Sequence, residues 1–152
     1  MDQPPFTGVH PWVAEAAIFT TEQDMPVLLT KQFRFEAAHW LPHMPEGHKC
    51  RRMHGHSFRF DVNLLGDVDP QTGLLMDFGD IKAVVKPYVD QLDHWCLNEV
   101  GDRKGEPLLQ NPTSENLAQW MYHELSPQLP GLYSIVFYET CTTRCEYRPQ
   151  WD

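Results

Sequence analysis

Two stretches of alternating apolar and polar residues predict β-strands in the first half of the chain. From Val27 to Ala37, apolar side chains recur at every second position apart from Lys31, and a second run alternates from His54 to Leu64. Successive side chains on a strand point to opposite faces, so each run indicates a strand buried on one side. The buried positions would be Leu29, Phe33, Phe35 and Ala37 on the first strand, and His54, His56, Phe58, Phe60, Val62 and Leu64 on the second.

Two later stretches repeat apolar residues at helical spacing. The first follows Asp77, whose side chain can cap a helix, and the second follows Thr113 and stops before Pro127. Pro87 lies inside the first helix and has no N–H to donate, so we expect a kink or break between Ala83 and Pro87. The apolar stripes are Phe78, Ile81, Val85, Tyr88 and Leu92 in the first helix, and Leu117, Trp120, Met121 and Leu125 in the second.

Two short strands, Leu132 to Glu139 and Thr142 to Tyr147, complete a predicted ββααββ order. Strands and helices in separate runs indicate an α+β fold. A chain of 152 residues suits one domain, and neither a repeat nor a linker divides residues 27–152. Residues 1–26 are proline-rich and lack periodicity, so we assign them to an N-terminal extension.

The charge of the chain limits the classes of partner. A net charge of -9 and a pI near 5.2 argue against binding to nucleic acid or an anionic membrane. Residues 1–26 contain no Lys or Arg and no sustained apolar run, so we predict neither a signal peptide nor a membrane span. We therefore expect a cytoplasmic protein whose four cysteines are free thiols.

Three histidines are the strongest candidates for metal ligands. His54 and His56 are two residues apart on one predicted strand, so their imidazoles point the same way. His39 follows the first strand in phase with Phe33 and Phe35, and antiparallel pairing of the strands would bring it to the same face. Three imidazoles leave a coordination position open, as in a catalytic zinc site. The sequence therefore predicts Zn²⁺ bound by His39, His54 and His56.

Two alternatives remain open at this point. A His-x-His pair also occurs on ordinary strands, so His54 and His56 could be structural residues. Cys50 could act as a base or nucleophile, because neighbouring cations and a metal favour the thiolate. It could equally be a fourth zinc ligand, in which case the site would be structural.

Other charged residues close to the histidines in sequence suggest further roles. Lys49, Arg51 and Arg52 form a cationic cluster on an acidic chain, which indicates phosphate binding. Asp93 precedes His94, and a carboxylate beside an imidazole can fix its tautomer, as a proton relay requires.

Glu139 ends the third predicted strand in phase with Ile135 and Phe137, so alternation directs its carboxylate toward an apolar face. Burying a carboxylate costs several kcal/mol unless it is paired. We therefore expect a ligand or a basic partner for Glu139, such as the guanidine-like edge of a ring. If the strand frays at this point, Glu139 is simply exposed.

Five segments, in the right order, resemble the 6-pyruvoyl-tetrahydropterin synthase superfamily: FEAAHWLPH, GHKCRRMHGHSF, LDHWCLN, NPTSENLA and YETCT. The resemblance runs from about Leu29 to Tyr147. It implies the tunnelling fold, in which each subunit has a four-stranded antiparallel sheet with two helices on one face. It also implies a homo-oligomer whose sheets join into a barrel, with active sites between subunits.

Seven positions match the functional residues of that superfamily, and the same seven are candidates on chemical grounds: His39, Cys50, His54, His56, Asp93, His94 and Glu139. The resemblance implies that His39, His54 and His56 hold zinc, and that Cys50 abstracts a proton. It implies that Asp93 and His94 form a relay, which could serve a neighbour's zinc, and that Glu139 grips a pterin ring.

The spacing from Cys50 to His54, CxxxHGH, resembles the 6-carboxy-5,6,7,8-tetrahydropterin synthase branch of queuosine biosynthesis. This branch implies conversion of 7,8-dihydroneopterin triphosphate to 6-carboxy-5,6,7,8-tetrahydropterin, with release of acetaldehyde and triphosphate. One alternative is a pyruvoyl-type elimination of triphosphate that leaves the carbon chain intact. Another is a non-catalytic, zinc-stabilised pterin-binding module in which Cys50 ligates the metal.

Overall fold

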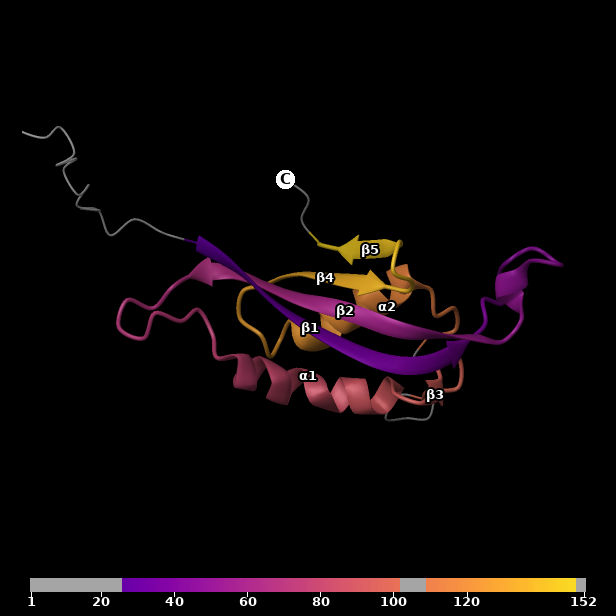
Figure 1. Ribbon diagram of the computed structural model, residues 1–152, viewed down its shortest axis with the longest axis horizontal. Helices are drawn as coiled ribbons and strands as arrows, with labels where there is room; N and C mark the ends of the chain where they lie inside the picture. Colours follow the sequence, from indigo (N-terminus) through magenta and orange to yellow (C-terminus); the bar gives the residue numbers. More distant parts are fainter. Residues whose placement is uncertain (1–25, 102–108, 150–152) are drawn as a thin grey trace, which may run out of the picture.

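A computed structural model describes residues 26–101 and 109–149 as an open, five-stranded sheet with two α-helices (Figure 1). Almost all of the predicted extension, residues 1–25, lies outside the described residues. The strand order is β3-β1-β2-β4-β5. The elements are β1 (Pro26–His39), the 3-10 helix η1 (Lys49–Arg51), β2 (His54–Asp67), α1 (Phe78–Leu92), β3 (Trp95–Cys96), α2 (Ser114–Leu125), β4 (Leu132–Tyr138) and β5 (Arg144–Tyr147).

The first two predicted strands are confirmed and form the longest pairing of the sheet. β1 and β2 are antiparallel over 14 residues each, from Pro26 opposite Asp67 to His39 opposite His54. Burial alternates along both strands as the sequence predicts, except at Asn63, which is buried between Val62 and Leu64. This register sets His39 directly beside the start of the His-x-His segment.

The sheet has one strand more than the four predicted, and it is not wholly antiparallel. β3 pairs in parallel with the end of β1, where Ala37 and Ala38 are its partners. Two residues are too few to show alternation, so no periodic signal marks this strand. A backbone hydrogen bond positions this strand: as the chain leaves α1, the His94 N–H donates to the carbonyl of Glu36 on β1.

Both predicted helices are confirmed; of the kink or break predicted near Pro87, the break is wrong. Asp77 and Thr113 cap α1 and α2 with their side chains, and α1 continues through Pro87. Pro87 is exposed, so the carbonyl that loses its helical donor can be hydrated. The buried side chains of Val85 and Leu92 hold both halves of the helix on the core.

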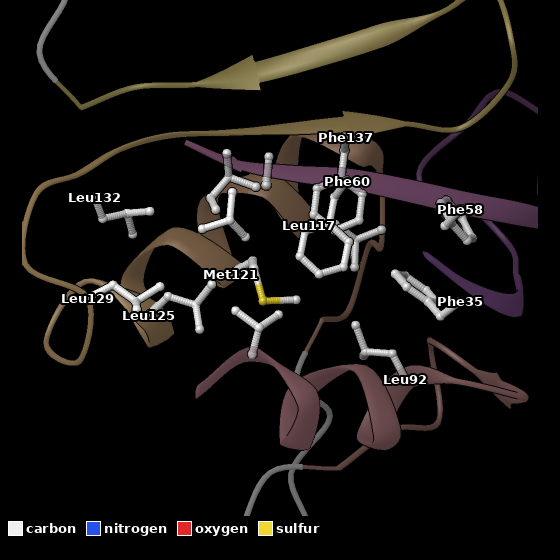
Figure 2. Packing of buried hydrophobic residues seen from close by; sticks show 14 of the residues in the cluster. Phe35, Phe58, Phe60, Leu92, Leu117, Met121, Leu125, Leu129, Leu132 and Phe137 are labelled. Atoms are coloured by element: carbon white, nitrogen blue, oxygen red, sulfur yellow. The ribbon is translucent and has the colours of Figure 1, made fainter. Parts of the chain in front are cut away.

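The core lies between the helices and one face of the sheet (Figure 2). Aromatic rings form its centre: Phe35 stacks on Phe58 with 5.1 Å between ring centroids, and Phe60 stacks on Phe137 at 5.0 Å. The aromatic contacts extend to the histidines, because the centroid of the His39 ring lies 5.4 Å from that of the Phe58 ring. The hydrophobic core therefore forms the floor of the candidate site.

Among the described residues, no helix is long and apolar enough to cross a membrane.

Candidate metal centre

The three predicted histidine ligands meet at the paired ends of β1 and β2. The centroids of the His39 and His54 rings are 4.6 Å apart, and those of His54 and His56 are 5.0 Å apart. A nitrogen from each ring and a carboxylate oxygen of Glu139 all lie within 4.8 Å of one another. Strand register and alternation are thus sufficient to gather three imidazoles around one point.

Backbone carbonyls fix the orientation of two of the rings. The Nδ1 of His39 lies 2.8 Å from the carbonyl oxygen of Pro112, and the Nδ1 of His54 lies 2.7 Å from that of Arg52. A carbonyl can only accept, so Nδ1 must carry the proton and Nε2 the lone pair. This is the tautomer required of a histidine that binds a metal through Nε2, and the carbonyl contact is a typical outer-shell interaction.

The three Nε2 atoms are buried, and none has a hydrogen-bond partner. Burial lowers the pKa of His39 and of His56, and so keeps their rings neutral near pH 7. Buried nitrogens without partners are costly, whereas neutral imidazoles are good ligands for Zn²⁺ and related divalent ions. The donor set therefore fits a metal ion.

Glu139 follows β4 and completes the group. Its Oε1 lies 3.0 Å from the Nε2 of His56, without hydrogen-bond geometry, and 3.7 Å from the Nε2 of His39. Its Oε2 accepts a hydrogen bond of 3.0 Å from the Oγ of Ser114 at the start of α2. The carboxylate is therefore anchored on one oxygen by Ser114 and faces the histidines with the other. The basic partner expected for Glu139 from the sequence stays a prediction.

A cavity of about 690 Å³ opens beside the histidines. Cys50 lines it, and its loop is held by two hydrogen bonds: the Leu41 N–H donates to the carbonyl of Cys50, and the Cys50 N–H donates to the Nδ1 of His48. The cavity is lined by Lys49, Cys50, Arg52, Met53, His54, His56, Glu139, Thr140 and Thr143. Among the described side chains, the group able to hold a metal does not include Cys50.

Asp93 and His94 form a pair outside the cavity that Cys50 lines, and His94 lines a second hollow together with His56. Asp93 accepts from the Glu36 N–H at 2.9 Å, and its second oxygen lies 3.0 Å from the Nδ1 of His94. The Glu36 N–H and, less strongly, the His94 ring lower the pKa of Asp93. The His94 side chain is 77% exposed, and its backbone has a positive φ of 63°. Neither residue lines the cavity that contains Cys50.

Comparison with known proteins identifies the family. The family model described as 6-pyruvoyl tetrahydropterin synthase matches residues 28–150. The chain belongs to this family. It is 45% identical over 126 residues to 6-carboxy-5,6,7,8-tetrahydropterin synthase of Synechocystis sp., covering 79% of this chain and 92% of the relative. It is also 35% identical over 97 residues to dihydroneopterin monophosphate aldolase of Pyrococcus furiosus, covering 64% and 73%.

A solved structure agrees with this assignment. The 6-pyruvoyl tetrahydropterin synthase of Caenorhabditis elegans superposes with a TM-score of 0.72 at 26% identity, covering 82% of this chain and 96% of that one. The predicted α+β fold of the 6-pyruvoyl tetrahydropterin synthase family is thus confirmed, although the sheet described here is open and has five strands.

Three contributors to the site were missed by reasoning from sequence: the Ser114 hydroxyl and the carbonyls of Pro112 and Arg52. Ser114 and Pro112 belong to the NPTSEN segment at the start of α2. The capping signal at Thr113 marks the helix start, but nothing in it reveals which neighbouring strand the helix faces.

Proposed function

We propose that the chain is a zinc-dependent 6-carboxy-5,6,7,8-tetrahydropterin synthase of queuosine biosynthesis. It would convert 7,8-dihydroneopterin triphosphate and water to 6-carboxy-5,6,7,8-tetrahydropterin, acetaldehyde and triphosphate. The main support is the convergence of three buried, partnerless Nε2 atoms, those of His39, His54 and His56, beside a cavity that His54, His56 and Cys50 line. The names of the relatives, foremost the Synechocystis enzyme, support the choice of pterin.

In this proposal His39, His54 and His56 hold the zinc through Nε2. The bound ion would supply Lewis acidity, which makes the side-chain hydroxyls of the substrate more acidic. Cys50, which lines the cavity together with His54 and His56, takes one proton from the substrate.

The other two roles concern alignment and proton exchange. Glu139 binds the ring edge of the pterin through Oε1, while the Ser114 hydroxyl holds Oε2 in place. Asp93 orients His94, which exchanges the second proton. Because this pair is exposed and absent from the wall of its own cavity, we place it in the active site of a neighbouring subunit in a homo-oligomeric barrel. We expect this oligomer to be cytoplasmic.

Incubation of the purified protein with 7,8-dihydroneopterin triphosphate, with and without a chelator, tests the proposal. Mass analysis should show 6-carboxy-5,6,7,8-tetrahydropterin and acetaldehyde only when the metal is retained. Loss of triphosphate without acetaldehyde would instead identify a pyruvoyl-type synthase. Cys50→Ala separates the enzyme from a non-catalytic module, because the enzyme should keep its zinc and lose turnover, whereas a module with Cys50 as ligand would lose zinc.

A further inference from the structure

The cavity beside the metal centre has a cationic wall formed by two of the three basic residues of its loop. Lys49 and Arg52 line the cavity, whereas Arg51, between them in sequence, does not. Helix η1 produces this separation, because three consecutive residues on a 3-10 turn point in different directions. The predicted cluster of three cations is therefore a pair facing the cavity and one residue facing elsewhere.

These two cations are available to a ligand. Within residues 26–101 and 109–149, no ion pair involves Lys49 or Arg52, although the chain carries 21 acidic residues and a net charge of -9. The acidic residue that shares the cavity wall with them, Glu139, accepts a hydrogen bond from Ser114 and faces the histidines with its other oxygen. Two unmatched cations in a cavity of an acidic chain attract an anionic group.

Hydroxyl groups lie on the same cavity wall. Thr140 and Thr143 line it, and their Oγ1 atoms are 2.7 Å apart. A phosphate oxygen can accept from a hydroxyl as well as from an ammonium or a guanidinium group. The wall thus offers charge-assisted donors from one loop and neutral donors from another.

We propose that Lys49 and Arg52 bind the phosphate chain of the substrate and set the preference for a triphosphate, and that Arg51 takes no part. This inference rests on the proposed function, in which the histidines and Glu139 occupy the rest of the site. A single phosphate offers fewer negative charges and acceptor oxygens to these two cations than a triphosphate does. The arrangement therefore selects among dihydroneopterin phosphates by the number of their phosphates.

Side-chain substitutions can test this without disturbing the metal centre. Arg52 contacts His54 only through its backbone carbonyl, so Arg52→Gln keeps the contact that orients that ring. We compare the double variant Lys49→Gln/Arg52→Gln with the control Arg51→Gln, which removes a cation from the same loop. Both are made in a Cys50→Ala background, so that turnover does not consume the ligand, and the zinc content of each protein is measured.

Dissociation constants are measured for 7,8-dihydroneopterin and for its monophosphate and triphosphate. The parent should bind the triphosphate more tightly than the unphosphorylated compound. In the double variant this preference should shrink by about tenfold to a hundredfold, because two charge-assisted contacts are lost. In Arg51→Gln it should stay within about twofold of the parent, and affinity for unphosphorylated dihydroneopterin should be the same in all three.

The outcomes separate this inference from the proposed function. If the ligands bind in the expected order but the unmodified protein forms no 6-carboxy product, the function is wrong and the phosphate subsite stands. If the double variant keeps the triphosphate preference, or Arg51→Gln loses it to the same degree, the subsite is wrong whatever the product. If no pterin binds, both fail.

Discussion

The Ser114→Ala substitution tests whether the start of α2 positions the carboxylate of Glu139. The Ser114 hydroxyl donates to Oε2 at 3.0 Å, and Ser114 itself is buried. A hydrogen bond to a charged group contributes about 1.5–3 kcal/mol, and partial exposure of Glu139 reduces this to about 1–2 kcal/mol. Alanine suits the first turn of the helix, and Thr113 remains as its cap.

We expect Ser114→Ala to lower kcat/KM for 7,8-dihydroneopterin triphosphate roughly fivefold to thirtyfold, which is 1–2 kcal/mol expressed as a rate. The loss should appear mainly in KM, zinc content should not change, and Ser114→Thr should restore most of the activity. Asp77→Ala is the matched control, because it removes the cap of α1 and costs about 1 kcal/mol of stability far from the site. Wild-type kcat/KM in Ser114→Ala, or an equal loss in Asp77→Ala, would refute this role.

Three further predictions concern the metal, the core and the oligomer. Chelation should lower Tm by several degrees, because a ligand at a thousand times its Kd stabilises the fold by about 4 kcal/mol, and His54→Ala should abolish this response in a thermal melt. Phe58→Ala should cost about 3–5 kcal/mol in urea unfolding and weaken zinc binding in competition with a chelating dye, because Phe58 is fully buried under His39. Co-refolding equal amounts of the inactive Cys50→Ala and His94→Ala chains should restore about a quarter of the wild-type activity, because random mixing reunites the two wild-type residues at that fraction of shared sites. No recovery in mixed oligomers would place both residues in one subunit's site.

The histidine cluster could be predicted because the positions of its members follow from regular structure. Alternation along β2 sets His54 and His56 on one face, and the pairing of β1 with β2 sets His39 opposite His54. The helix starts at Asp77 and Thr113 could also be predicted, because an N-cap residue is a local signal in the sequence.

The features that could not be predicted depend on how distant segments meet. The short strand β3 has no periodicity and forms through backbone pairing with β1. The contacts that fix the His39 and His54 rings come from carbonyls of Pro112 and Arg52, and every residue has a carbonyl. The continuity of α1 through Pro87 depends on which side of the helix faces solvent. Local composition encodes none of these relations.

The division between strand and loop residues explains how one fold could hold a metal and still vary in substrate. His39 and His54 are directly opposite each other in the register of β1 and β2, and Phe58 on the same face joins their site to the core. A slip of one residue would turn every side chain of one strand to the other face, so the position of the histidine cluster is as strongly specified as the core itself. The cations that we assign to phosphate binding belong to the loop between the strands, where Lys49 or Arg52 can change without altering that register. Differences in phosphate preference among relatives should therefore be found in this loop, while the histidine positions stay tied to the strands.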